Sequence, residues 1–259
     1  MMHSVRETII VGEKDGNDGK EGGLMERIRK RVRKYKLSRV VEVGEPDVEK
    51  PKSFKYIIMN LPVEKISGEK LAEMRKKAGF IRNLLDIRIA REIDIPGLRD
   101  LYNAAFFQCP DPYRPITIED MTKIFHKATI IIANLYGTDA GFIILKIEQR
   151  SPDEAQGTEE TPVAADSNSL REDDVRTVRV GVIAGIAVLP QHRNKGVATA
   201  IGLKGWEYLS DKNLDFLQCE VYEENEPSLS LITWVGFRPV GELVLKAPSA
   251  AAINPLERI

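Results

Sequence analysis

The chain has few of the residues that cross-link small folds or bind metal ions. Of its 259 residues, two are cysteines (Cys109 and Cys219) and three are histidines (His3, His126 and His192). Two cysteines are too few for a disulfide framework or a cysteine metal cluster, and the histidines do not have the spacing of metal ligands. We therefore expect no metal site, and the low cysteine content favours a reduced, cytoplasmic setting.

Long hydrophobic runs are also missing. No apolar run approaches 18 residues, and the first residues lack the hydrophobic region of a signal peptide. Apolar residues make up 42% of the chain and charged residues 30%, which is ordinary for a soluble globular protein of one or two domains. We expect neither membrane insertion nor export.

The chain has almost no excess of either charge, since its net charge is −1, but its positive and negative residues are unevenly distributed. Residues 1–83 carry 20 Lys and Arg against 13 Asp and Glu (net +7), whereas residues 84–259 carry 18 against 26 (net −8). This asymmetry predicts a basic N-terminal accessory α+β region over 1–83. A second domain is expected over 84–245, followed by a tail over 246–259.

Within the N-terminal region, hydrophobic periodicity predicts strands at 6–11, 40–43 and 54–60, and helices at 24–36 and 68–77. The first helix is basic over most of its surface, with seven Lys and Arg between Arg27 and Lys36. A solvated basic face is the ordinary interpretation. Contact with nucleic acid or a ribosome through Arg27–Lys36 is the alternative, because such a field attracts phosphates.

From residue 84 onward the chain alternates strands and helices. The expected strands are 85–90, 129–135, 141–147 and 178–189, and the expected helices are 94–106 and 117–127. Residues 151–176 hold eight acidic residues, two basic residues and no aromatic residue. Such a segment cannot bury enough apolar surface to offset its ordering entropy, so we expect a disordered acidic insertion there.

An anion site is predicted where one of these strands ends. The apolar run from Ile183 to Leu189 is stopped by Pro190, and a basic turn with Arg193 and Lys195 leads to Gly196. A helix is expected to begin there. Its first N–H groups have no partner within the helix, and its dipole adds about half a positive charge. This pattern favours a bound phosphate.

A second segment lies about 30 residues further on. It reads as a strand from residue 217, a helix capped by Asn225, and a helix stop at Gly236 followed by Phe237. Ser228 is three residues after the asparagine, and the Gly-Phe pair is eleven and twelve residues after it.

The two segments together identify a family. The first is neither a Walker A loop nor a G-x-G-x-x-G loop. Instead, Arg193-x-x-Gly196-x-Ala198 after a strand, with Asn225-x-x-Ser228 and Gly-Phe downstream, resembles the GNAT superfamily of N-acetyltransferases. The resemblance implies an α/β fold with an α+β mixed sheet, whose fourth and fifth strands splay apart around acetyl-CoA. The small N-terminal α+β region lies outside the resemblance.

The resemblance also implies which residues bind acetyl-CoA. The backbone of the fourth strand would pair with the pantetheine arm, at Ile186, Ala187 and Val188. The pyrophosphate would sit on the loop and helix start, at Arg193, Asn194, Lys195, Gly196, Val197, Ala198 and Thr199. Asn225 would hydrogen-bond the pantetheine arm, and it could equally be a simple helix cap.

Catalytic groups follow less directly. Glu220 matches the position of a general base in several peptide-acetylating members, although an exposed strand carboxylate would look the same. The tyrosine that protonates the departing thiolate in many members is replaced by Ile232, which leaves Tyr222 or a water as donor. The loop between the first two helices would meet the acceptor, at Phe107, Tyr113 and Arg114.

These residues predict an enzyme that transfers the acetyl group of acetyl-CoA to a primary amine. Deprotonating a lysine side chain at pH 7 costs about 4.6 kcal/mol and an α-amine only about 1, so a single base favours an α-amine or a small amine of low pKa. The alternative is a non-catalytic acyl-CoA-binding module docked through its basic N-terminal region. The acceptor, the acyl chain length and the oligomeric state stay open.

Overall fold

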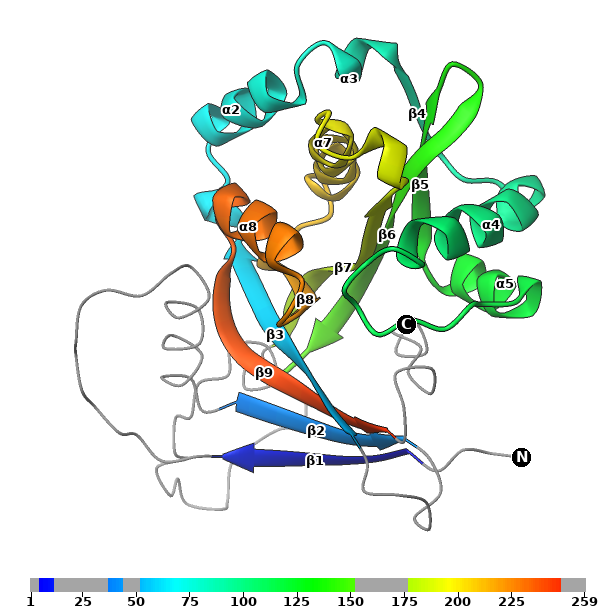
Figure 1. The fold of residues 1–259 in the computed structure, drawn as a ribbon. Helices are drawn as coiled ribbons and strands as arrows, with labels where there is room; N and C mark the ends of the chain where they lie inside the picture. Colours follow the sequence, from blue (N-terminus) through cyan, green and yellow to red (C-terminus); the bar gives the residue numbers. More distant parts are fainter. Residues whose placement is uncertain (1–4, 12–36, 44–51, 152–176, 248–259) are drawn as a thin grey trace.

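The computed structural model describes residues 5–11, 37–43, 52–151 and 177–247 (Figure 1). The basic helix expected at 24–36, with its proposed nucleic-acid contact, lies outside the described residues. So do residues 152–176 of the acidic insertion and residues 248–259 of the tail.

The described strands form a single mixed sheet in the order β1-β2-β9-β3-β8-β7-β6-β5-β4. The strands are β1 (Val5–Val11), β2 (Leu37–Val43), β3 (Lys52–Pro62), β4 (Leu85–Ile89), β5 (Thr129–Leu135), β6 (Thr138–Arg150), β7 (Val178–Val188), β8 (Phe216–Tyr222) and β9 (Arg238–Ala247). The strands expected from periodicity are confirmed, and β6 is longer at both ends than the hairpin arm expected at 141–147.

The helices are also close to expectation. They are α2 (Gly68–Ala78), α3 (Ile81–Leu84), α4 (Ile95–Phe106), α5 (Ile118–Lys127), α7 (Val197–Leu209) and α8 (Glu226–Val235). Three 3-10 turns are described beside them, at η1 (Val63–Lys65), η2 (Glu92–Asp94) and η4 (Pro190–His192). None of the described helices is long and apolar enough to cross a membrane.

Local sequence signals explain where the helices begin and end. The Thr117 hydroxyl accepts from the Asp120 N–H at 3.1 Å while the Asp120 carboxylate accepts from the Thr117 N–H, a capping box that starts α5. The Asn225 side chain caps α8 through the Ser228 N–H. Gly236 ends α8 with φ at +126°, a conformation that favours glycine.

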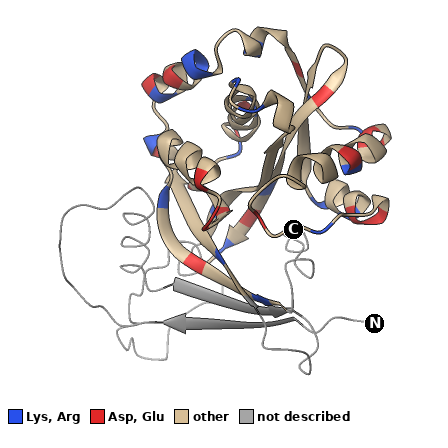
Figure 2. Cartoon of the chain, viewed as in Figure 1, with Lys and Arg blue, Asp and Glu red and all other residues tan. Residues whose placement is uncertain are grey.

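The helices cover the sheet on both faces. On one face α4 buries Ile95, Leu98, Leu101, Tyr102 and Ala105, a helical stripe that packs with α5 on the inner residues of β5 and β6. On the other face α7 and α8 pack on β6, β8 and β3. Figure 2 marks Lys, Arg, Asp and Glu positions on α2, α4 and α5, and others along the strands.

Strand β3 has an unexpected place in this sheet. It lies between β8 and β9 and pairs antiparallel with both, so that Tyr56 faces Tyr222 on one side and Leu243 on the other. Five of its residues, Tyr56–Met59 and Leu61, are at most 4% exposed. The charge asymmetry led us to expect a separate region over 1–83, but residues 52–62 lie inside the sheet of the following residues. Composition could not reveal this, because strand pairing over 160 residues leaves no local signal.

Helix α2 is joined to the same core. Met74 and Ala78 are buried against Ala200 and Leu203 of α7. On α8 the Trp234 ring lies 3.9 Å from the Lys77 ammonium, within the range of a cation–π contact. The helix therefore bridges α7 and α8 on their outer side, as seen in Figure 1.

Candidate active site

The parallel strands β7 and β8 pair over a short length and then part. Their pairing runs from Val180 with Phe216 to Ile183 with Cys219, and β7 continues to Val188 without β8. At the point of separation β7 carries one extra residue, Ala184, relative to β6. Such a bulge bends a strand and increases its twist, which accounts for the divergence. The edge of β7 beyond Ile183 is thus left facing an opening in the sheet.

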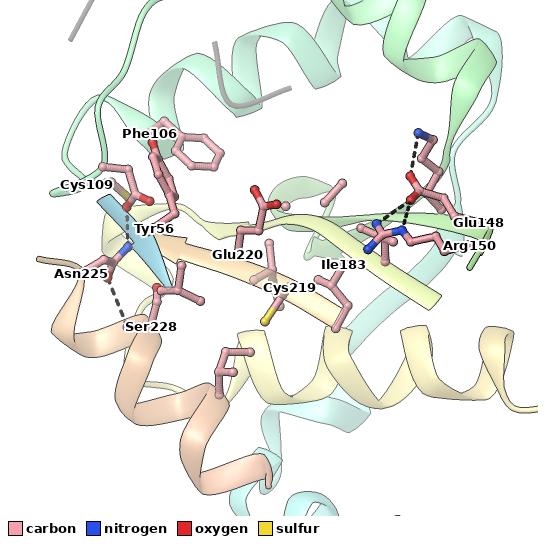
Figure 3. A pocket seen from close by; sticks show the side chains of 18 residues that line it. Tyr56, Phe106, Cys109, Glu148, Arg150, Ile183, Cys219, Glu220, Asn225 and Ser228 are labelled. Carbon is pink, nitrogen blue, oxygen red and sulfur yellow. Dashed lines mark hydrogen bonds and ion pairs between the residues drawn. The ribbon is translucent and has the colours of Figure 1, made fainter. Parts of the chain in front are cut away.

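A cavity of about 170 Å³ lies at this opening, on the face that carries α4 and α5. Its floor comes from β7 and β8, its walls from β6, β3 and the loop after α4, and its far side from α8. The residues that line it include Tyr56, Asp111, Lys146, Glu148, Arg150, Glu220, Asn225 and Ile232. Figure 3 shows Glu220 near the middle, with Glu148 and Arg150 at one end and Tyr56, Cys109 and Asn225 at the other.

A second, mostly apolar cavity of about 70 Å³ lies between α7 and α8. Helix α2 roofs it with Lys70, Leu71 and Met74. The two cavities share Ile183, Ile186 and Ile232 as lining residues. Because these residues stand where β7 and β8 part, the two cavities approach the same opening from opposite faces of the sheet.

The start of α7 presents backbone donors that have no partner within the helix. Gly196 caps the helix in the left-handed region, with φ at +87°. The first bond of α7 runs from the Ala200 N–H to the Gly196 carbonyl oxygen, so the N–H groups of residues 197–199 have no partner within the helix, whereas those of His192 and Arg193 close the preceding turn. Thr199 is buried at the first turn of the helix. Free donors at a helix N-terminus suit a phosphate group.

Gly196 is also held by packing. A Cβ added there would lie 2.7 Å from the Ala78 carbonyl oxygen and 3.0 Å from the Ala78 Cα, at the end of α2. The glycine therefore allows α2 to approach the loop, in addition to any approach by a phosphate.

The two basic residues of the loop are occupied. The Arg193 guanidinium donates to the carbonyl oxygens of Val188 at 3.1 Å, Gln108 at 3.1 Å and Ala105 at 2.8 Å. The Lys195 ammonium donates to the Gln191 carbonyl oxygen at 2.7 Å. We expected mobile charges for a phosphate. Arg193 instead ties the loop to the end of α4, because the last carbonyl groups of a helix need donors.

The loop after α4 brings a carboxylate into the first cavity. Asp111 is partly buried there and accepts a hydrogen bond from the Asn225 side-chain amide. Burial raises the pKa of Asp111, and the bond from Asn225 opposes this rise. The same Asn225 side chain caps α8 through its oxygen. The amide expected to meet the pantetheine arm is therefore already engaged at both ends.

The proposed catalytic residues differ in their access to the cavity. Glu220 is the one exposed residue of β8 and lines the cavity. Tyr222 is buried in a cluster with Tyr56, at 5.5 Å between ring centroids, and is not a lining residue. Burial, with a contribution from Glu224, raises the pKa of Tyr222. Ile232 of α8 lines the cavity, and Tyr56 of β3 brings a phenol to it from another side.

The loop residues expected to meet the acceptor lie off the cavity. Phe107 is 74% exposed, the Tyr113 hydroxyl donates to the Asn103 side chain, and Arg114 does not line the cavity. Their loop neighbours Phe106, Cys109 and Asp111 line it instead. Alternation along an irregular loop cannot be read from sequence, so the contact of Phe107, Tyr113 and Arg114 with the acceptor stays a prediction.

Three charged side chains of β6 were missed altogether. Lys146 and Arg150 both donate to the Glu148 carboxylate, at 2.9 Å from the Lys146 ammonium and 2.9 Å from the Arg150 Nε. Arg150 also bonds Gln218, and Gln218 bonds Asn60 of β3 at 2.8 Å. The two hydrogen bonds to Glu148 lower its pKa against the effect of burial. The spacing i, i+2, i+4 on a strand was the available signal, since it places all three on one face.

Residues 5–11, 37–43, 52–151 and 177–247 contain no group of three His, Cys, Asp or Glu side chains that could hold a metal ion. Both cysteines are free, and burial raises the pKa of the Cys109 thiol.

We compared the chain with protein-family models and with solved structures. The model of the acetyltransferase (GNAT) family matches residues 95–237. Among solved structures, aminoglycoside N-acetyltransferase AAC(6')-Iy in complex with CoA is 20% identical with a TM-score of 0.40, covering 60% of this chain and 92% of that chain. A putative acetyltransferase from the GNAT family of Novosphingobium aromaticivorans is 12% identical with a TM-score of 0.47, covering 78% and 66%.

An N-acetyltransferase from Staphylococcus aureus is 18% identical with a TM-score of 0.43, covering 57% of this chain and 80% of that chain. No curated protein sequence matches the chain. The family match spans more than half of the chain, and the diverging strands with the free N–H groups lie within it. This protein therefore belongs to the GNAT family of acetyltransferases.

Proposed function

We propose that the protein transfers the acetyl group of acetyl-CoA directly to a primary amine, at the opening between β7 and β8. The observation that carries the proposal is the pair of cavities that meet at Ile183, Ile186 and Ile232 from opposite faces of the sheet. Two substrates can reach one point from two sides through such a passage. The free thiols of Cys109 and Cys219 support a reducing, cytoplasmic setting as part of the same proposal.

The chain's own groups fit acetyl-CoA, which supplies an activated acetyl group as a thioester. The first N–H groups of α7, which have no partner within the helix, suit the pyrophosphate. The unpaired edge of β7 at Ile186, Ala187 and Val188 suits an amide-bearing arm, which hydrogen-bonds as a strand does. The apolar cavity under α2 would cover that arm. Backbone N–H groups of the β7 edge would also polarise the thioester carbonyl.

Glu220 would take the proton of the attacking amine. Its carboxylate lies near the middle of the cavity, on the acceptor side of the opening (Figure 3). A positioned base contributes about 10²–10⁴-fold to such a reaction, while holding amine and thioester together contributes more. We therefore propose Glu220 as the general base and positioning by both cavities as the larger effect.

Tyr56 would return a proton to the departing sulfur. It is the one phenol among the described residues that line the cavity, which it lines from β3 while Ile232, at the family's tyrosine position, lines it from α8. Its neighbour Tyr222, our first candidate, belongs to the same buried cluster as Tyr56 but does not line the cavity. The donor would thus come from β3, outside the segment matched by the family model.

Release of CoA from acetyl-CoA, followed with a thiol reagent across a panel of amines, tests the proposal. We expect Glu220→Gln to lower kcat/KM about 100-fold, while Glu207→Gln on the outside of α7 leaves it unchanged. Tyr56→Phe should lower kcat by a similar factor, and Tyr136→Phe, at a residue 77% exposed, should not. Full activity of Glu220→Gln would remove the proposed base.

The proposed phosphate loop is best tested by changing the ligand and leaving the protein unchanged. A Gly196 side chain would clash with Ala78, so a variant there would report on folding as well as on binding. Acetyl-pantetheine lacks the pyrophosphate and leaves the protein intact. We expect its KM to exceed that of acetyl-CoA about 100-fold, the effect of losing two hydrogen bonds to a charged group. Equal KM values would contradict a pyrophosphate site at residues 194–199.

A further inference from the structure

The acceptor cavity is polar at both ends, and the two ends differ in charge. The ion triad, defined as Lys146, Glu148 and Arg150, holds two cations on one carboxylate and so keeps one net positive charge. The middle and the opposite end carry the carboxylates of Glu220 and Asp111. Figure 3 shows Glu148 and Arg150 separated from Asn225 by the position of Glu220.

The triad is held in place by the sheet. Lys146 stands opposite Val182 of β7, which stands opposite Gln218 of β8. The Arg150 guanidinium reaches across β7 to that Gln218, which is itself fixed by Asn60. The three charged side chains are between 16% and 25% exposed, so their charges are only partly screened by water.

The separation between the triad and Glu220 limits the size of a molecule that could contact both. Two strand spacings of about 4.8 Å and a two-residue rise of about 6.7 Å put the Cα atoms of Lys146 and Glu220 about 12 Å apart. Side chains fill most of that distance, so only a small molecule fits between them. An amine held at Glu220 would place a neighbouring group of the same molecule beside the triad.

We propose that the acceptor is a primary amine that also carries a carboxylate, of the class of amino acids and short peptides. The amine would lie at Glu220 and the carboxylate at the cationic triad, where the Lys146 ammonium has donors beyond the one given to Glu148. A polycationic amine without an anionic group would meet positive charge at that end of the cavity. This inference rests on the proposed function and names its substrate class.

Rates with matched acceptors test the inference. Dipeptides with a free C-terminal carboxylate would be compared with the same dipeptides amidated at the C-terminus, and with spermidine. We expect kcat/KM for the free acids to exceed that for the amides at least tenfold, as for a charge-assisted hydrogen bond. Free amino acids in the same panel separate the two sources of the carboxylate. Equal or faster turnover of the amides or of spermidine would overturn the inference.

Variants of the triad add a second test. Lys146→Gln should lower kcat/KM for the free acid at least tenfold more than kcat/KM for the amide, and Lys146→Arg should restore the preference for the free acid. Lys204→Gln is the matched control, since that lysine pairs with Glu207 at 3.0 Å on the outside of α7. A loss of the same size for acid and amide in Lys146→Gln would show a structural role only.

Binding separates failure of the inference from failure of the proposed function. The N-acetylated dipeptides and their amides would be titrated calorimetrically into the full chain with CoA present. Tighter binding of the free acids, lost in Lys146→Gln, with no turnover of any amine would reject the transfer reaction and keep the carboxylate site. Turnover with no difference in binding or rate between acid and amide would keep the reaction and reject the site.

Discussion

At the scale of single residues, two glycines of α7 show how similar positions carry different constraints. Both Gly202 and Gly205 lie inside the helix, where glycine costs about 1 kcal/mol relative to alanine. A Cβ on Gly205 would lie 3.2 Å from Ile143 Cδ1 of β6, so the helix sits tightly on the sheet there. A Cβ on Gly202 would meet only Met74 Cε, at 4.0 Å. Tight packing explains the glycine at Gly205 and does not explain the one at Gly202.

The two glycines form a matched pair of variants. We expect Gly202→Ala to raise the free energy of unfolding by up to about 1 kcal/mol, because helix propensity improves and nothing clashes. Gly205→Ala should be neutral or destabilising by about 1 kcal/mol, because overpacking offsets the same gain. Urea unfolding of both variants measures the difference. Equal stabilisation of the two would mean that α7 can shift away from β6.

At the scale of elements, the start of α4 is fastened to β4 by one ion pair. The Arg88 guanidinium donates two hydrogen bonds to the Asp94 carboxylate, at 2.7 Å and 2.9 Å, and the Arg91 N–H donates a third at 2.7 Å. The hydrogen bonds from Arg88, more than any other cause, lower the pKa of Asp94 to about 2. The Asp94 side chain is 15% exposed, so this pair is less screened than most on the surface.

This pair predicts a pH dependence of stability. Because the folded pKa of Asp94 lies below the unfolded value of about 3.9, its contribution is complete above pH 4 and is lost as the pH falls towards 2. We expect Asp94→Asn to destabilise the protein by about 1–2 kcal/mol at pH 7, allowing for screening at Arg88, and by progressively less between pH 4 and pH 2.

Thermal unfolding of wild type and Asp94→Asn between pH 2 and pH 7 checks this expectation. Asp100→Asn is the control, since that side chain is 69% exposed and should change stability little. A difference between wild type and Asp94→Asn that stays constant down to pH 2 would assign the effect to lost packing instead of to charge.

The elements themselves were predictable wherever a local pattern specifies them. Residues close together in the sequence specify several of these features. They are the apolar stripe of α4, the capping box of α5, and the Asn225 cap and Gly236 stop of α8. The loop at Gly196 came from the same kind of local signal, whereas Glu220 was chosen from the resemblance to the GNAT superfamily. Positions that depend on tertiary contacts had no such signal. Arg193 reads as a free cation in sequence, and only the fold brings the carbonyl groups of α4 to it.

At the scale of the whole molecule, one long-range pairing changes both the domain organisation and the site. Strand β3 closes the sheet between β8 and β9 and supplies Tyr56 to the acceptor cavity, and the helix that follows roofs the second cavity. Residues 52–84 precede the segment matched by the family model and nevertheless contribute to both sides of the opening. The charge asymmetry of the chain suggested a boundary near residue 84 because charge reports the surface and not the pairing of buried strands.

The energetic weight of β3 predicts how the chain tolerates truncation. Five buried side chains, Tyr56–Met59 and Leu61, are at most 4% exposed. Burial of each large apolar side chain contributes about 1.5–3 kcal/mol, and a whole domain is stable by about 5–15 kcal/mol. Their sum is comparable with the entire stability. A chain that begins at residue 85 should therefore fail to fold cooperatively, whereas a chain that begins at residue 52 should retain a cooperative transition because β3 and α2 are kept.

Thermal melts followed by circular dichroism, with size-exclusion chromatography of both truncated chains, distinguish these outcomes. The chain that begins at residue 52 is the control for the loss of residues 1–51. Among the described strands, β2 pairs only with β1 and β9, so removing it leaves the pairing of β3 intact. A sharp, reversible transition in the chain from residue 85 would show that β8 and β9 can close the sheet without β3. The acceptor cavity would then have to be completed by other residues than Tyr56.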